Sequence, residues 1–294
     1  MYDIENYYNA STIAEAVELL KEHPQARIIS GGSDVLIKIR EGKMAGTSLV
    51  CIRDIKEIQG VQRMDSGDIY IGAGTTFSHI TADPVIRRWI PVLGEAVDQV
   101  GGPQIRNIGT IGGNVCNGAV SADSAPTLFS LNALLRLSDG KGGRTVPIEK
   151  FYLGPGKVDL QPGEMLTHIV IPEREYMGYH GHYVKYSMRN AMDIATLSCS
   201  VVSKVDPVKK ILEDVRITFG VAAPVPYRCA KTEEVLKGMA LGEKLYEEAE
   251  NLVRQEINPR DSWRASRAFR VQIAGEIAKR ALIRTVELAG GKKA

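Results

Sequence analysis

The sequence predicts an α+β protein of roughly two domains. Up to residue 171, strand-like and helix-like hydrophobic patterns alternate, whereas beyond residue 182 the strand-like runs come first and the helices last. Residues 172–182 are polar, contain glycine and follow no hydrophobic period, which is typical of a domain boundary. We therefore expect one domain over residues 1–175, with α/β subdomains at roughly 1–57 and 58–175, and a second domain over residues 180–294.

A helix is expected after Thr12, because Thr12 and Glu15 have capping-box spacing ahead of an apolar stripe. The apolar run Ala26–Ile29 predicts a strand that ends at a glycine pair, and Asp34 is placed to cap the next helix. Helical periodicity continues from Pro84 to Val100, and another helix is expected at 126–132. Further strands are expected at 49–52, 69–73, 134–137 and 166–171.

The second part contains three strand-like runs, followed by two helical segments. The runs are Tyr183–Tyr186, Ile194–Val205 and Val215–Ala222, which predicts a three-stranded sheet. The helices are expected at Glu243–Ile257 and Ala265–Leu288.

Charge and composition exclude several classes of protein. The 37 basic and 35 acidic side chains give a net charge of +2, so broad binding of nucleic acid or acidic membranes is not expected. No apolar run of ~18 residues predicts a membrane span, and the acidic start of the chain does not resemble a signal peptide, so we expect a cytoplasmic protein. The 4 cysteines are scattered without C-x-x-C, which favours reduced thiols and no metal site.

Two glycine loops suggest a binding site. SGGSD at 30–34 follows a predicted strand, and RNIGTIGGN at 106–114 follows a predicted helix. Glycine allows backbone N–H groups to approach a ligand closely, so two such loops, each offering several free N–H donors, suit a dinucleotide pyrophosphate. Neither loop matches G-x-G-x-x-G or the Walker pattern. The first loop alone is equally consistent with an ordinary tight turn.

The stretch after the second loop is small and polar, with few charges, as expected for backbone lying against a ligand. Asp123 is its only acidic residue. Two roles remain open for this carboxylate: it could accept hydrogen bonds from ribose hydroxyls, or it could cap the helix that follows.

Together these segments resemble the FAD-binding subunits of the molybdenum hydroxylases, the xanthine dehydrogenase and carbon monoxide dehydrogenase group. The resemblance covers the whole chain and is carried by IISGGSD at 28–34, RNIGTIGGN at 106–114, DSAP at 123–126 and KYSMRNAMDIA at 185–195. GPGK at 154–157 and PRDSWRAS at 259–266 look most like bacterial xanthine dehydrogenase.

The resemblance implies a fold and a function. The fold is the two-subdomain FAD-binding fold of the vanillyl-alcohol-oxidase/PCMH type, followed by a C-terminal α+β domain. The function is electron transfer: FAD takes electrons from a [2Fe-2S] partner subunit and reduces NAD⁺ or another acceptor, while a molybdopterin subunit hydroxylates xanthine or another purine. A related hydroxylase for nicotinate, an aldehyde or carbon monoxide is the alternative within the enzyme class, and a non-catalytic flavin-binding protein is the alternative outside it.

The resemblance also implies which residues hold FAD, whose flavin does the chemistry, so no catalytic side chain is expected on this chain. The first loop would wrap the pyrophosphate, and the second would enclose the pyrophosphate from the other side. Lys185 would stabilise the reduced flavin. Without the resemblance, Lys185 would be an ordinary solvated strand residue. The implied set is Arg27, Ile28, Ile29, Ser30, Gly31, Gly32, Ser33, Asp34, Val100, Gly109, Thr110, Ile111, Gly112, Gly113, Asn114, Asp123, Met165, Leu166 and Lys185.

Two departures from the family pattern bear on function. Some relatives have an aromatic residue in place of Val100, which would stack on the flavin, and NAD-using relatives often have two arginines where this chain has Arg189-Asn190. The second departure weakens the expectation that NAD⁺ is the acceptor.

Overall fold

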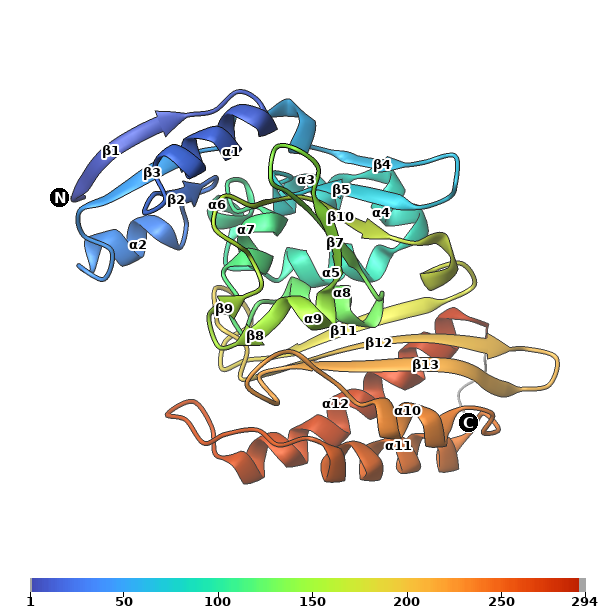
Figure 1. Ribbon diagram of the computed structural model, residues 1–294. Helices are drawn as coiled ribbons and strands as arrows, with labels where there is room; N and C mark the ends of the chain where they lie inside the picture. The colour runs from blue at the N-terminus through green and yellow to red at the C-terminus, as the bar shows by residue number, and fades with distance from the viewer. Residues whose placement is uncertain (1, 291–294) are drawn as a thin grey trace.

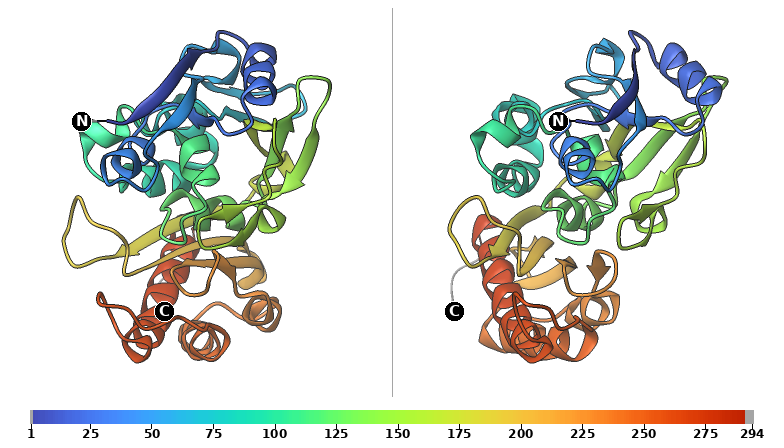
Figure 2. Two further views of the ribbon diagram at one scale, coloured as in Figure 1. Left: turned by 60° about the vertical axis from the view of Figure 1, so that its left-hand side comes forward. Right: turned by 90° about the vertical axis from the view of Figure 1, so that its left-hand side faces the viewer.

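The computed structural model describes residues 2–290 and consists of three packed bodies, stacked from the N-terminal sheet to the C-terminal helices (Figures 1 and 2). The N-terminal body is a parallel sheet of order β1-β3-β2. Its elements are β1 (Ile4–Asn9), α1 (Ile13–Glu22), β2 (Arg27–Ile29), α2 (Val35–Arg40), β3 (Thr47–Cys51) and the short η1 (Lys56–Ile58).

The middle body is an antiparallel sheet of order β4-β5-β10-β6-β7, with helices packed on one face. Buried residues of this sheet and of α3, α5, α7 and α8 form its hydrophobic core. The strands are β4 (Val61–Arg63), β5 (Ile69–Gly72), β6 (Leu134–Ser138), β7 (Arg144–Pro147) and β10 (Met165–Ile171), with a separate hairpin of β8 (Tyr152–Gly154) and β9 (Lys157–Val158). The helices are α3 (Phe77–Ala82), α4 (Pro84–Trp89), α5 (Pro91–Asp98), α6 (Pro103–Arg106), α7 (Ile111–Cys116), α8 (Ser124–Ser130), α9 (Ile148–Phe151) and η2 (Glu173–Glu175).

The C-terminal body is an antiparallel sheet of order β11-β12-β13-β14, which lies between the middle body and the last helices (Figure 2). Side chains of β12, β13, α11 and α12 share a second hydrophobic core. The elements are β11 (His180–Tyr186), β12 (Leu197–Asp206), β13 (Ile211–Gly220), β14 (Tyr227–Arg228), α10 (Ala230–Leu236), α11 (Glu243–Glu256) and α12 (Arg267–Leu288).

This architecture confirms the predicted fold class and corrects several of its details. The C-terminal sheet has a fourth strand, β14, which pairs with β13. The sequence did not predict it, because its two residues have no hydrophobic pattern of their own. The helix expected from Pro84 to Val100 is two helices, because Ile90 leaves the helical conformation and Pro91 begins a new one. The stretch 172–182 is not wholly irregular, since β11 begins at His180.

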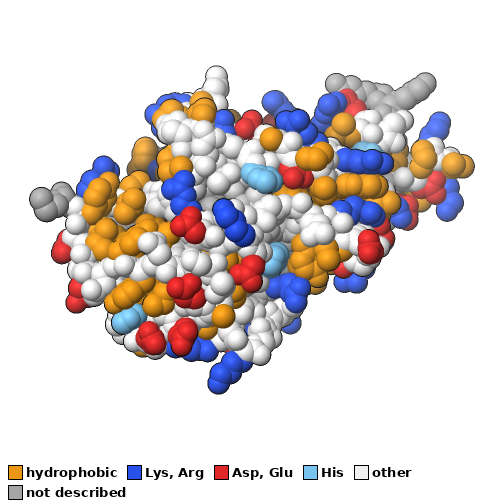
Figure 3. All heavy atoms as spheres, turned by 90° about the horizontal axis from the view of Figure 1, so that it is seen from above, with side chains coloured by type: hydrophobic (Ala, Val, Ile, Leu, Met, Phe, Trp, Pro, Cys, Tyr) orange, Lys and Arg blue, Asp and Glu red, His pale blue; other side chains and the backbone are white. Residues whose placement is uncertain are grey.

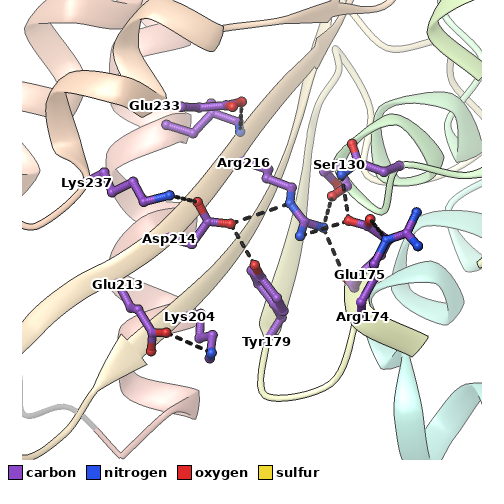
Figure 4. A network of polar contacts seen from close by, with 12 residues as sticks. Ser130, Arg174, Glu175, Tyr179, Lys204, Glu213, Asp214, Arg216, Glu233 and Lys237 are labelled. Carbon is purple, nitrogen blue, oxygen red and sulfur yellow. Dashed lines mark hydrogen bonds and ion pairs between the residues drawn. The ribbon is translucent and has the colours of Figure 1, made fainter. Parts of the chain in front are cut away.

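Arg216 fastens the C-terminal sheet to the middle body. Its side chain is 5% exposed, and its guanidinium donates to the carbonyl oxygens of Ser130 and Glu175 at 3.1 and 2.9 Å (Figure 4). It also pairs with the Glu175 carboxylate at 3.0 Å and lies over the ring of Tyr179. Because a buried guanidinium is costly unless its donors are paired, these contacts with Ser130 and Glu175 stabilise one relative position of the two bodies.

The surface over the N-terminal body carries basic and acidic side chains side by side (Figure 3). This distribution agrees with the net charge of +2 and gives no single-sign region on the face shown.

Candidate functional site

The first glycine loop leaves β2 and enters α2 through a left-handed residue. Gly32 has φ of +72°, a conformation that residues with a Cβ rarely adopt. Within the described chain, the main-chain N–H groups of Gly31, Gly32, Ser33 and Asp34 donate no hydrogen bond. These N–H groups lie just before and at the start of α2, where helix geometry leaves donors unpaired, and their residues are half-buried or exposed. They are therefore available to an external acceptor.

The second loop lies directly against the first. A Cβ on Gly31 would come within 1.9 Å of the carbonyl oxygen of Ile108 and 3.0 Å of the α-carbon of Gly109. The two loops, which are distant in the sequence, therefore form one structure. This contact between two backbones by itself requires glycine at position 31.

The second loop differs from the first in its hydrogen bonding. The N–H of Ile111 donates to the carbonyl oxygen of Thr75 at 3.0 Å, and that of Gly112 to Ala73 at 2.9 Å. The N–H groups of Gly113 and Asn114 are satisfied by the side chain and carbonyl of Thr110. The expectation that both loops offer several free donors is therefore wrong for the second loop, where α7 and its contact with the end of β5 use them.

Gly112 has a packing role. A Cβ at this position would lie 2.6 Å from both the Cβ and the carbonyl oxygen of Ala73. Gly109 similarly lies against the carbonyl of Ile105 and the ring of Phe77. These glycines let α7 approach the sheet and α3 closely, so they place the second loop relative to the first.

Asp123 and Lys185 form a buried ion pair between the middle and C-terminal bodies. The ammonium nitrogen of Lys185 lies 2.9 Å from Oδ2 of Asp123, and the two side chains are 5% and 9% exposed. The hydroxyl of Tyr183 donates to Oδ1 of Asp123 at 2.8 Å, and Lys185 also donates to the carbonyl oxygen of Gln99 at 2.9 Å. Lys185 is thus not a solvated strand residue.

The environment of Asp123 excludes the expected role of its side chain as the N-cap of α8. The residue precedes α8, but its side chain makes no capping hydrogen bond. Burial raises the pKa of Asp123, while the ammonium of Lys185 and the hydroxyl of Tyr183 act to lower that pKa. Burial and the neighbouring carboxylate also raise the pKa of Tyr183 well above its ordinary value, so its hydroxyl remains a donor.

The other expected cofactor residues lie in several environments. Arg27 is exposed on β2, Ile28 is half-buried, and Ile29 is in the core. Val100 is half-buried and follows Gln99, so the end of α5 approaches Lys185. The side chains at the start of β10, Met165 and Leu166, are 0% and 4% exposed and pack inside the protein.

Sequence reasoning missed three residues at this site. Lys38 and Asn117 bond to each other beside the first loop, and Tyr183 holds Asp123. Asp34 does not cap α2 as expected, because its carboxylate accepts from the side chain of Asn117 at 3.0 Å. The only available signal was the position of Asn117 in the small polar stretch, since Lys38 and Tyr183 look like ordinary helix and strand residues.

Among residues 2–290, no group of three His, Cys, Asp or Glu side chains is arranged to hold a metal ion. In the same range, no helix is both long and apolar enough to cross a membrane. The donor set of the first loop fits the pyrophosphate of a dinucleotide, because its free main-chain N–H groups carry no competing partner within the protein.

Two family models match the chain. The model described as the FAD binding domain in molybdopterin dehydrogenase covers residues 2–174. The model described as the CO dehydrogenase flavoprotein C-terminal domain covers residues 182–285. The first matched range contains both glycine loops and Asp123, and the second contains Lys185.

Similar proteins cover the same length. The chain is 38% identical over 292 residues to the xanthine dehydrogenase FAD-binding subunit of Escherichia coli O157:H7, with 99% of each chain covered. It is 31% identical to the carbon monoxide dehydrogenase medium chain of Afipia carboxidovorans, covering 95% of this chain and 96% of that one. A chain of the carbon monoxide dehydrogenase structure from Hydrogenophaga pseudoflava superposes with a TM-score of 0.91 at 26% identity, covering 98% and 99%. The chain belongs to the family of FAD-binding subunits of the molybdenum hydroxylases, as the glycine loops and the full-length matches together show.

Proposed function

We propose that this chain transfers electrons within a multi-subunit molybdenum hydroxylase that acts on xanthine or another purine. Electrons would arrive from a [2Fe-2S] subunit and leave to NAD⁺ or another acceptor, while hydroxylation would take place on a molybdopterin subunit. The purine assignment is supported by the similarity to the xanthine dehydrogenase subunit and by the motifs at 154–157 and 259–266.

The proposal depends on one observation above all: the free N–H groups of residues 31–34, placed against the second loop by the contact of Gly31 with Ile108. Bound FAD would supply the two-electron redox chemistry. Residues 31–34 would hold its pyrophosphate by main-chain hydrogen bonds. Lys185, oriented by Asp123, would provide a fixed positive charge in a place from which water is largely excluded.

Cofactor selectivity tests this site. We expect the purified chain to bind FAD noncovalently and to bind FMN much more weakly, because FMN has a single phosphate and no pyrophosphate. Equilibrium titration followed by flavin fluorescence measures both affinities. Equal affinity for FAD and FMN would contradict the assignment of residues 31–34 to the pyrophosphate.

Separation of the chain from its partners tests its place in the reaction. The sequence has no C-x-x-C motif and no iron–sulfur ligand set, so the isolated chain should not oxidise xanthine. With FAD bound, it should still catalyse slow reduction of a dye by NADH if NAD⁺ is its acceptor. Turnover of xanthine by the chain alone would refute the proposal.

Native co-purification tests the partners directly. Purification of the chain from its host should bring with it one subunit that contains molybdopterin and one that contains [2Fe-2S] clusters, as shown by cofactor analysis of the complex. Reduction of this complex by xanthine, followed by trials of NAD⁺ and of dye acceptors, identifies the substrate and the acceptor. A chain that purifies alone with FAD would favour a non-catalytic flavin-binding protein.

A further inference from the structure

One amide side chain connects two opposite charges beside the first glycine loop. Oδ1 of Asn117 accepts from the ammonium of Lys38 at 2.8 Å, and Nδ2 of Asn117 donates to Oδ2 of Asp34 at 3.0 Å. Asp34 immediately precedes α2, and Lys38 lies one turn further along that helix. Asn117 follows the last residue of α7, so the connection joins the N-terminal body to the middle body.

These three side chains make no other hydrogen bond or ion pair within the part of the chain that the structure describes. Asp34 has a second role at this place, because its own N–H is one of the free donors of the first loop. A carboxylate without a partner would stand next to those donors and would repel a pyrophosphate. Asn117 gives that carboxylate a donor and holds the Lys38 ammonium nearby.

We propose that Asn117 is a positioning residue for the cofactor: it fixes the charge of Asp34 beside that of Lys38 and holds the free donors of residues 31–34 against α7. This inference rests on the proposed binding of FAD. An amide suits the role because its donor and its acceptor are separate atoms, so it bonds a carboxylate and an ammonium at once. In this account Asp34 contributes its N–H to the cofactor, while its side chain serves the connection.

Two variants test the inference: one replaces the Asn117 amide with a carboxylate, and the other exchanges the amide of Asn117 and the carboxylate of Asp34. Asn117→Asp places a second carboxylate opposite Asp34, so we expect FAD binding at pH 8 to weaken by about tenfold or more. Binding should recover as the pH is lowered, because a proton shared by the two carboxylates restores a hydrogen bond. In the double variant Asp34→Asn/Asn117→Asp the amide and the carboxylate exchange places and Lys38 gains an ion pair. That variant should bind FAD within about threefold of the wild type at pH 8.

Asn251→Asp is the matched control, since it makes the same change at an exposed position of α11. Thermal unfolding without FAD is measured for every variant, to separate binding from folding. Three results would overturn the inference: wild-type affinity in Asn117→Asp, no recovery at lower pH, or a reversed double variant that folds but binds as weakly as the single variant. A wild-type chain that binds no FAD would instead refute the proposed function, and the inference with it.

Discussion

Gly31 and Ile108 meet backbone to backbone: a Cβ on Gly31 would lie 1.9 Å from the carbonyl oxygen of Ile108. This contact joins the N-terminal body to the second glycine loop and leaves no room for any other residue at position 31. The free donors of the first loop are held in place by it. The geometry of the candidate FAD site therefore depends on this close approach as well as on the Asn117 connection.

Substitution of Gly31 tests this contact. Gly31→Ala should move the two loops apart, which we expect to cost about 1–3 kcal/mol of folding free energy and to weaken FAD binding by at least tenfold. Urea denaturation and FAD titration measure the two effects. Gly142→Ala is the matched control, because a Cβ on Gly142 would meet no atom within 4 Å. Equal behaviour of the two variants would show that the loops adjust freely.

Gly32 and Gly112 should respond differently to substitution. Gly112→Ala should destabilise the chain even without FAD, by about 1–3 kcal/mol, because the new Cβ meets Ala73 in the interior. Gly32 needs φ of +72°, so Gly32→Asn should cost less than Gly32→Val, since asparagine tolerates this conformation and β-branched residues do not. Comparison of the unfolding midpoints of the three variants without cofactor checks both expectations. Similar losses for Asn and Val would argue against a backbone cause at position 32.

Removal of Lys185 should destabilise the fold. Lys185→Met leaves the buried carboxylate of Asp123 without a cation, which we expect to cost about 3–5 kcal/mol. Without Lys185 the pKa of Asp123, already raised by burial, would rise further, so the folded state would retain a proton that the unfolded state has lost. The loss of folding free energy in Lys185→Met should therefore grow as the pH rises from about 4 to neutral.

Two variants serve as controls for this prediction. Lys204→Met, which breaks an exposed ion pair with Glu213, should cost no more than about 1 kcal/mol. The double variant Asp123→Asn/Lys185→Met should recover most of the lost stability in urea denaturation, since no buried charge is left unpaired. A double variant as unstable as Lys185→Met would show that the loss comes from packing and not from charge.

The same pair should influence the redox potential of bound FAD in opposite directions. Lys185→Met removes a positive charge and should lower the midpoint potential, whereas Asp123→Asn removes a negative charge and should raise it. The midpoint potential should shift by about 30 mV for each ~1.4 kcal/mol by which a variant changes the stability of reduced relative to oxidised FAD. Spectroscopic redox titration of the FAD-loaded variants measures these shifts. Unchanged potentials in both variants would remove Lys185 from the proposed flavin site.

His168 should contribute to loss of stability in acid. Burial in β10 and the nearby guanidinium of Arg136 lower the pKa of His168, so the unfolded state binds its proton more readily than the folded state. Stability from this residue is therefore present at pH 7 and is lost as the pH falls through about 6.5. His168→Gln should lose less stability between pH 7 and pH 5 than the wild type, as measured by urea midpoints. His79→Gln is the comparison, because His79 is an exposed residue of α3 whose ring lies 3.5 Å from the carboxylate of Asp83 and not in the core. An acid loss in His168→Gln identical to that of the wild type would assign the effect to other groups.

The sequence by itself determined the two glycine loops, most of the longer strands and helices, and the family. These features are local, because hydrophobic period and glycine position are visible within short windows. Elements without a hydrophobic period, such as β1 and the two-residue β14, were not predictable, since they are strands only through their pairing with β3 and β13.

Only the tertiary structure decided how the site is built. Lys185 and Asp123 lie 62 positions apart in sequence, and Asn117 and Asp34 lie 83 apart, so neither contact leaves a local pattern. The different use of N–H groups in the two loops was also hidden, because it depends on whether another segment supplies an acceptor. In the second loop the end of β5 does so, and in the first loop no part of the described chain does. The reason is physical: a backbone donor's partner is set by packing between distant segments, which residue type alone does not specify.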